Sequence, residues 1–313
     1  MLNCVFAYKN EYEIVPIDKV HFMKKNFWID AIDPTKDELR KLEEKTGIPF
    51  ENIKEALDVH ERPRATLHEG YQHIVYKAPL TEDKKIETIS FSIFVFPNVI
   101  ITLRKKDFSV FKDIAEMSHA SKLQLFKSPA NFALHLLDMI SDKYFYLLDH
   151  IEDNIHQLEE RIFKPTRSDI VRDIFKAKRT LIYFHKAMTA NRDVTTSISS
   201  DFFQRHDFDE HLLRMLRHDI TELIDLIGIY REVLSSSMEI YISQTSLSLN
   251  VIIKKMTAIA SFILIPTLIA SIYGMNFRVM PELYWSYGYY FAIGLMVCSV
   301  VAMYVYFKRQ MWL

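Results

Sequence analysis

The sequence of 313 residues predicts an α+β domain with a mixed, largely antiparallel sheet, followed by a long helix and two C-terminal transmembrane helices. Segments rich in β-branched and aromatic residues alternate with helical patterns up to about residue 115, which predicts the sheet. From residue 128 onwards, apolar residues recur at a helical spacing. No charged residue lies between Thr257 and Phe277 or between Leu283 and Phe307. Each run can cross a hydrocarbon core of roughly 30 Å, so we expect a membrane protein.

The N-terminal region shows mixed periodicity. We expect a helix to open at Asp33-Pro34, because proline suits a first turn and acids follow, and to stop at Gly47. A second, shorter helix is expected over residues 49–59 and is ended by Pro63. Pro97-Asn98 separates two strand-like runs and predicts a hairpin. The expected strands are Asn26–Asp30, His73–Lys77, Thr88–Phe96 and Val99–Leu103.

Three long helices are expected after residue 128. The first two, over 129–163 and from Asp169 to about Arg192, form an antiparallel pair, and 191–207 is expected to be a loop. The third, over 208–273, would be about 100 Å long as one helix at 1.5 Å per residue. Its apolar stripe needs partners, which predicts a parallel bundle of stalk helices in an oligomer.

The charges that flank the membrane helices predict their orientation. Lys254 and Lys255 precede the first membrane helix, and Lys308 and Arg309 follow the second. By the positive-inside rule, both termini are cytoplasmic and the loop between the helices is external. The predicted segments are a cytoplasmic α/β domain (1–127), an antiparallel helical pair with its loop (128–207), a cytoplasmic stalk helix (208–255), a first transmembrane helix (256–273), an external loop (274–286), a second transmembrane helix (287–307) and a basic cytoplasmic tail (308–313).

Composition excludes several classes of function. The net charge is −1 and the pI is about 6.9, so no basic field exists for nucleic acid. Cys4 and Cys298 form neither a plausible disulfide nor a zinc set. The N-terminus lacks the basic and apolar regions of a signal peptide, so we expect a cytosolic domain. The soluble part has no Gly-x-Ser-x-Gly, His-Glu-x-x-His or glycine-rich phosphate loop, so we do not expect an enzyme.

The end of the first membrane helix carries Gly274-Met275-Asn276 after a tyrosine, and the loop contains Met280-Pro281-Glu282-Leu283. The basic tail ends in Trp312-Leu313, and residues 47–64 end in His-x-Arg-Pro-Arg. Together these features resemble the CorA family of divalent-cation channels and transporters over most of the chain. The resemblance implies a funnel-shaped homopentamer in the inner membrane. It also implies that the soluble domains bind divalent cation between subunits and close the pore when cytosolic Mg²⁺ is adequate.

One face of the helix that leads into this motif carries mainly small and hydroxyl residues. In a ring of identical helices this face would line a pore. Alternatively, the small residues only allow close packing between helices in the membrane. The face consists of Ser246, Asn250, Ile253, Thr257, Ala260, Leu264, Thr267 and Ser271.

No carboxylate lies on this face, which constrains the mechanism of permeation. Mg²⁺ dehydrates reluctantly, so we expect the pore to bind the ion with its water shell. The side-chain carbonyls of Asn276 and the backbone carbonyls of Gly274 and Met275 would accept hydrogen bonds from that water. Asn250 and Thr267 would form two further polar rings along the pore.

Apolar residues on or beside the same face are candidate gates that close by dewetting: Leu264, Met256 and Ile253. In the external loop, Glu282 would concentrate cations at the mouth of the pore. Alternatively, Glu282 is a solvated acid that pairs with Arg278.

The resemblance implies a regulatory acid at Glu55, on the helix before His-x-Arg-Pro. The partner acid on the stalk would fall on Met215, which departs from the family pattern and leaves the regulating ion open. Four stalk residues could substitute, and their histidines suit Zn²⁺, Co²⁺ or Ni²⁺ better than Mg²⁺. Alternatively, Glu55 and these stalk positions are solvated or packed and hold no ligand. The four stalk residues are His211, His218, Asp219 and Glu222.

We therefore expect a magnesium channel that also admits Co²⁺, with Ni²⁺ as a further candidate. The membrane potential would drive permeation, because it gives a divalent charge about 4.6 kcal/mol at 100 mV. A zinc transporter of the same superfamily is an alternative, although Pro281-Glu282-Leu283 favours magnesium. A membrane-anchored sensor without conductance is the alternative outside transport. The expected partners are further copies of the chain, the lipid bilayer and divalent cations.

Overall fold

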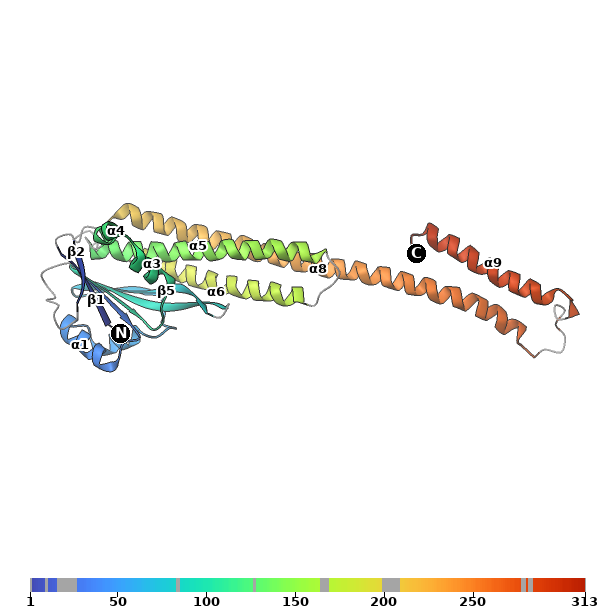
Figure 1. Cartoon of the computed structure of the whole chain (residues 1–313), viewed down its shortest axis with the longest axis horizontal. Helices are drawn as coiled ribbons and strands as arrows, with labels where there is room; N and C mark the ends of the chain where they lie inside the picture. The colour runs from blue at the N-terminus through green and yellow to red at the C-terminus, as the bar shows by residue number, and fades with distance from the viewer. Residues whose placement is uncertain are drawn as a thin grey trace. The chain divides into compact units, whose positions relative to one another are not determined.

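The computed structural model describes residues 2–8, 11–15, 27–82, 85–125, 128–163, 169–198, 209–276, 280 and 284–312. The chain divides into two compact units (Figure 1). Unit 1 comprises Met1–Arg161 and Arg167–Ser236, and unit 2 comprises Ile162–Thr166 and Ser237–Leu313.

Unit 1 is built on a seven-stranded sheet with the strand order β2-β1-β3-β7-β6-β5-β4. Among the described strands, only β3 and β7 pair in parallel, which confirms the predicted mixed, largely antiparallel sheet. The predicted hairpin is also confirmed, because the Phe96 N–H donates to the Val99 carbonyl across the β6–β7 turn at 2.7 Å. The strands are β1 (Leu2–Tyr8), β2 (Glu11–Val15), β3 (Phe27–Ile32), β4 (Arg64–His68), β5 (Tyr71–Glu82), β6 (Lys85–Val95) and β7 (Val99–Arg104).

Two short helices, α1 (Lys36–Thr46) and α2 (Phe50–Glu55), cover one face of the sheet. The predicted start of α1 at Asp33-Pro34 is wrong, because Thr35 is the N-cap and forms a reciprocal capping box with Glu38. Gly47 ends α1 as predicted, with a φ of 73° in the left-handed region. The side chains that pack between these helices and the sheet include Ile29, Leu42, Ile48, Ile53, Phe94 and Ile101.

The second helix is shorter than predicted. It was expected to reach about Val59, whereas α2 ends at Glu55. The Leu57 and Asp58 N–H groups donate to carbonyls only three residues back, at 3.2 and 3.0 Å, so tight turns replace the helix. The Asp58 carboxylate then accepts the His60 N–H at 2.9 Å, which stabilises the turn before Arg62-Pro63.

Further helices cover the opposite face of the sheet (Figure 1). The aromatic core beneath them is centred on Trp28, whose ring lies edge-to-face with Phe132 at 5.2 Å and stacks with Phe111 at 6.2 Å. The Trp28 indole N–H donates to Thr102 Oγ1 at 2.9 Å, so this polar group is satisfied inside the core. The helices are α3 (Ser109–Glu116), α4 (His119–Leu125), α5 (Pro129–Ile162), α6 (Asp169–Ser197) and α8 (Glu210–Tyr273).

The predicted loop at 191–207 is wrong in its first part, because α6 continues to Ser197. Asn191 is completely buried and forms two hydrogen bonds with the backbone of Lys77 in β5. Its Oδ1 accepts the Lys77 N–H and its Nδ2 donates to the Lys77 carbonyl, both at 2.9 Å. The edge strand β4 begins opposite Val75, so the Asn191 side chain takes the place of a neighbouring strand beyond that point. Residues 199–208 lie outside the described residues.

A different polar contact joins α6 to α8. Arg217 donates from Nε and Nη2 to the carbonyl oxygen of Thr195, at 3.1 and 2.7 Å. Thr195 lies in the last turn of α6, where carbonyl groups have no partner within the helix. Arg217 therefore caps α6 from the neighbouring helix.

We predict that Asn191→Leu destabilises the protein by about 2 kcal/mol, because it leaves two buried backbone groups without partners. Thermal or denaturant unfolding of the detergent-solubilised protein measures the change. Asn154→Leu is the matched control, since Asn154 is exposed on α5, and its effect should stay within about 0.5 kcal/mol. Equal effects of the two substitutions would contradict the prediction.

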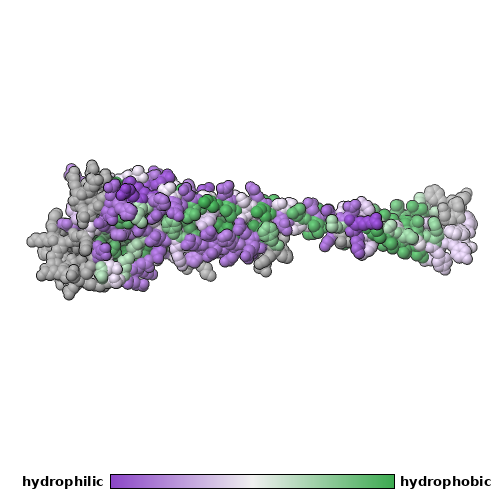
Figure 2. All heavy atoms as spheres, turned by 90° about the horizontal axis from the view of Figure 1, so that it is seen from above, coloured by the Kyte–Doolittle hydropathy of each residue, from purple (hydrophilic) through white to green (hydrophobic). Residues whose placement is uncertain are grey.

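Unit 2 contains the C-terminal part of α8 and the helix α9 (Gly288–Arg309). The predicted uninterrupted helix is confirmed from Glu210 to Tyr273, with Pro266 inside it. Both α8 and α9 contain segments long and apolar enough to cross a membrane. Figure 2 shows hydrophobic residues exposed over this unit. The helix α9 also includes Lys308 and Arg309, which were predicted to belong to the tail.

Candidate metal and pore sites

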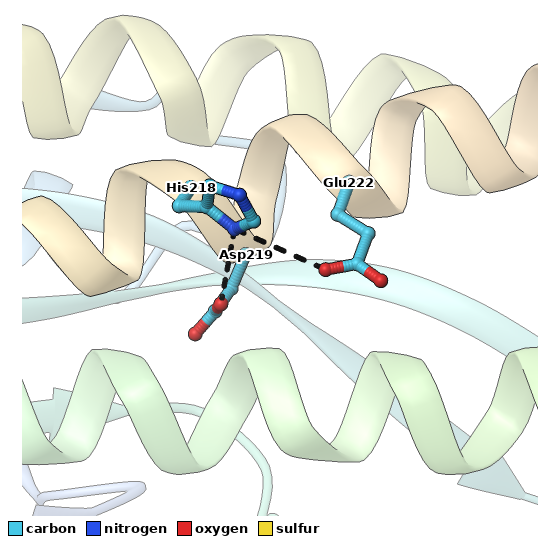
Figure 3. Close-up of side chains that lie close together, drawn as sticks. All are labelled: His218, Asp219 and Glu222. Atoms are coloured by element: carbon cyan, nitrogen blue, oxygen red, sulfur yellow. Dashed lines mark ion pairs between the residues drawn. The ribbon is translucent and has the colours of Figure 1, made fainter.

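Three of the four predicted stalk ligands lie together on one turn of α8: His218, Asp219 and Glu222 (Figure 3). His218 Nδ1 lies 3.9 Å from Asp219 Oδ1 and 3.9 Å from Glu222 Oε2. The ligand atoms all lie within 4.8 Å of one another, so one ion could contact all three. An imidazole with two carboxylates suits Zn²⁺, Co²⁺ or Ni²⁺. His218 is 79 % exposed, which leaves coordination positions open to water or to a further ligand.

Two further acids, Asp138 and Asp142 on α5, act on this cluster, and they were not among the predicted site residues. Burial raises the pKa of Asp138 to about 6, and the charges of Asp142 and Asp219 add to the increase. Burial also raises the pKa of Asp219, although the neighbouring His218 opposes the change. A cation near these carboxylates would relieve their mutual repulsion. The pairing of α5 with α8 creates this arrangement, and no local sequence signal indicates it.

We predict that Asp138→Asn raises the melting temperature at about pH 7.5 and that this gain disappears near pH 4. Burial holds the pKa of Asp138 in the folded protein at about 6, above its ordinary value of 3.8, so folding favours the protonated form. The ionised carboxylate therefore lowers stability fully above pH 6, and this cost is lost progressively as the pH falls from about 6 to about 4. The control is Asp153→Asn, an exposed position on the same helix. A gain that is independent of pH would contradict the prediction.

The remaining predicted regulatory residues do not join this cluster within one chain. The His211 side chain is exposed, and its backbone N–H donates to Asp209 Oδ1 at 2.9 Å as part of the helix start. Glu55 ends α2 on the other face of the sheet, where its Oε2 lies 3.9 Å from Arg64 Nη2. Met215 is 48 % exposed on α8. A site that uses both Glu55 and the stalk would therefore need two chains.

The predicted selectivity motif lies where α8 ends. The Gly274 N–H donates to the carbonyls of Ala270 and Ser271 at 2.9 and 3.2 Å, so the helical turn continues into the motif. Gly274 does not adopt a left-handed backbone conformation. A Cβ atom there would lie 3.3 Å from the Ala270 oxygen, so close contact with the preceding turn favours glycine. Met275 and Asn276 are exposed at this end.

The other predicted pore and gate residues are exposed on the isolated chain: Asn250, Ile253, Met256, Leu264 and Thr267. Thr267 Oγ1 donates to the Ile263 carbonyl at 2.7 Å, so its hydroxyl oxygen keeps free acceptor capacity. Glu282, Arg278 and Leu283 lie outside the described residues.

Comparison with known proteins identifies the family. The family model described as "CorA-like Mg2+ transporter protein" matches residues 23–309, which include strands β3 to β7 of the sheet, the long helices and both apolar helices. The chain belongs to the CorA family. The resemblance inferred from the motifs is thereby confirmed, and the chain is a divalent-cation transporter of the membrane, not an enzyme.

Individual CorA proteins resemble the chain over most of its length. The cobalt/magnesium transport protein CorA of Methanocaldococcus jannaschii is 31 % identical and the match covers 91 % of each chain. The protein of the same name from Thermotoga maritima is also 31 % identical, over 88 % of this chain and 80 % of its own. The solved structure of the magnesium transporter CorA from M. jannaschii has a TM-score of 0.86 and 27 % identity, with 100 % and 99 % of the two chains covered. This agreement confirms the predicted fold class within a single chain.

Proposed function

We propose that this CorA protein is a channel for Mg²⁺ and Co²⁺, with Ni²⁺ as a further substrate, that carries the ions into the cell. The observation that carries the proposal is the end of α8, where Asn276 and Met275 are exposed directly after a segment without charged side chains. Neutral oxygen atoms suit an ion that keeps its water shell, because they can accept hydrogen bonds from that water. The names of the M. jannaschii and T. maritima relatives, which specify cobalt and magnesium, support this choice of ions.

The proposed pore requires several copies of the chain, and we propose a homopentamer. Apolar side chains of α8 that remain exposed on one chain support self-association, because a helix with such a surface buries it against neighbours. They include Ile229, Ile240, Ile242, Leu247 and Leu249. In this assembly Asn276, Thr267 and Asn250 would form successive polar rings, and Leu264, Met256 and Ile253 would close the pore.

We propose that the soluble domain closes this channel when divalent cation is abundant in the cytosol. The acids Asp138, Asp219 and Glu222 repel one another when no cation is bound, whereas a bound cation would hold the stalk in one arrangement. Glu55 would contribute from a neighbouring chain. The positive-inside rule places both termini in the cytosol, with Lys254, Lys255, Lys308 and Arg309 at the inner surface. We also propose that the chain is divided, as predicted, into a cytoplasmic domain, a helical pair, a stalk, two transmembrane helices with an external loop between them, and a cytoplasmic tail.

One observation favours a second substrate class. The cluster of His218, Asp219 and Glu222 contains a nitrogen ligand, which favours Zn²⁺ over Mg²⁺. A zinc transporter therefore remains the competing function. The two functions differ in which ion crosses the membrane.

Flux into proteoliposomes tests the proposal. Purified protein is reconstituted with dyes for Mg²⁺, Co²⁺ and Zn²⁺ inside the vesicles, and a negative-inside potential is imposed with K⁺ and valinomycin. We expect potential-dependent entry of Mg²⁺ and Co²⁺. Entry of Zn²⁺ without Mg²⁺ would establish the zinc function, and no entry of any divalent ion would support a sensor without conductance.

A further inference from the structure

A cavity of about 800 Å³ lies at the edge of the sheet in unit 1, and the residues that line it are distant in sequence from the pore motif. Residues 60–63 of the loop after α2 form one wall, β5 and β6 contribute the floor, and α6 closes the other side. Its size falls within the range of about 300–1,000 Å³ that small-molecule sites occupy. Four basic side chains line it: His60, Arg62, Lys77 and Lys186.

The positive charges of this cavity are only partly compensated. Arg62, Lys77 and Lys186 make no ion pair with any carboxylate in the part of the chain that the structure describes. Two acids also line the cavity, but Glu61 is paired with Arg64, which lies outside the lining. Glu87 is exposed to solvent. The lining therefore presents more available cations than anions.

A partly buried hydrogen-bond network fixes the position of Lys77 at the floor. Its Nζ donates to Ser90 Oγ at 3.2 Å, and Ser90 Oγ donates to the Glu61 carbonyl at 2.6 Å. The Ser90 N–H donates to the Val59 carbonyl at 2.9 Å, which holds the loop beside the strand. Ser90 is only 3 % exposed. Because the Asn191 amide holds the Lys77 backbone as well, the cationic floor and the loop are preorganised.

The electrostatics favour an anion between the lysines. Burial lowers the pKa of Lys77, and the positive charge of Lys186 lowers it further, although Asp58 opposes the change. Two like charges held close together are stabilised by an anion that bridges them. Arg62 adds a planar guanidinium, which can donate two parallel hydrogen bonds to phosphate oxygens.

We propose that this cavity binds a phosphorylated small molecule, whose phosphate groups contact Arg62, Lys77 and Lys186. The ring of Tyr183 lies in the wall and is 44 % exposed, so it can stack on a nucleotide base. The same positively charged side chains would bind either a free phosphate or the phosphate groups of a nucleotide. Only a nucleotide would also gain affinity from stacking on Tyr183.

Isothermal titration calorimetry on the full-length protein in detergent tests this site, in buffer with EDTA so that no divalent cation contributes. The probes are pyrophosphate, ATP and adenosine. We expect pyrophosphate and ATP to bind, and Lys186→Glu and Arg62→Gln each to weaken binding about tenfold or more. The matched control is Lys176→Glu, which makes the same charge change at an exposed position of α6 outside the cavity. We expect the affinity of Lys176→Glu for pyrophosphate and ATP to remain within about twofold of the native value.

The outcomes separate the source of the ligand from the existence of the site. Tighter binding of ATP than of pyrophosphate, lost in Tyr183→Ala, identifies a nucleotide site, whereas equal binding identifies a phosphate site. No heat of binding for either phosphorylated probe, or adenosine binding as tightly as ATP, would overturn the proposal. Equal weakening in Lys176→Glu and Lys186→Glu would also overturn it, because binding would then follow overall charge. None of these measurements depends on transport.

Discussion

Replacement of Asn276 by alanine is expected to abolish Mg²⁺ flux in proteoliposomes. The side-chain carbonyl of Asn276 is a neutral acceptor at the end of α8, and no described carboxylate of α8 lies near it to replace it. Losing one such group in every subunit removes a complete ring of acceptors from the proposed pore. At about 1 kcal/mol or more per hydrogen bond, the combined effect is a decrease of several orders of magnitude in flux. The measurement is the initial rate of dye response at a fixed negative-inside potential.

Asn154→Ala serves as the control, because Asn154 is exposed on α5 in the soluble domain. Its flux should equal that of the native protein after correction for the amount reconstituted. Size-exclusion chromatography shows whether Asn276→Ala still assembles, which separates lost selectivity from lost folding. Native flux in an assembled Asn276→Ala variant would reject Asn276 as a selectivity residue.

Arg104→Ala is expected to destabilise the protein by about 3–5 kcal/mol, since it leaves a buried carboxylate without its partner. Arg104 is 2 % exposed and forms an ion pair with Asp30, which is 7 % exposed. Its Nη2 donates to Asp30 Oδ2 at 2.9 Å, and its guanidinium lies 3.5 Å over the Phe111 ring. Thr102 Oγ1 donates to Asp30 Oδ1 at 2.7 Å, so both carboxylate oxygens of Asp30 accept hydrogen bonds. Denaturant unfolding of the detergent-solubilised protein, followed by a spectroscopic signal of the soluble domain, measures the decrease in the free energy of unfolding.

Lys106→Ala is the matched control, because Lys106 pairs with Glu82 at the surface and both side chains are exposed. Its effect should be below about 1 kcal/mol. The double variant Asp30→Asn with Arg104→Met should lose less stability than Arg104→Ala alone, because no buried charge remains unpaired. An additive loss in the double variant would contradict this explanation.

The elements that were predicted correctly have strong local patterns. The long helix α8 follows from apolar residues at a helical spacing, α9 follows from an uninterrupted apolar run, and the β6–β7 hairpin follows from Pro97-Asn98. The start of α1 was missed although Thr35 and Glu38 have the spacing of a capping box, because Pro34 gave a competing signal. The edge strand β4 has only five residues and little apolar character, so its pairing with β5 depends on tertiary structure.

Some contacts of the candidate sites also follow from local sequence spacing, whereas others depend on tertiary structure. His218 and Glu222 are four residues apart, so a helix alone places them on one face, and this prediction required no tertiary information. Asp138 meets Asp219 only because α5 and α8 pack together. The polar sequence around Asn191 suggested a loop, whereas the Asn191 amide bonds to the backbone of a strand 114 residues earlier in the chain. Long-range polar contacts of this kind leave no periodic signal in the sequence.

The contacts of Arg217 and Asn191 also bear on mechanics. Arg217 holds the Thr195 carbonyl in the last turn of α6, and Asn191 lies one turn earlier in the same helix and holds β5 at Lys77. Force applied along this part of α8 therefore reaches the sheet through directional bonds, in addition to apolar packing that would permit sliding. Lys178 Nζ of α6 also donates to Ser235 Oγ of α8 at 2.9 Å. We expect the sheet, α6 and the part of α8 up to Ser235 to rotate as one lever. Any bending during gating would then be concentrated in the segment of α8 beyond these bonds.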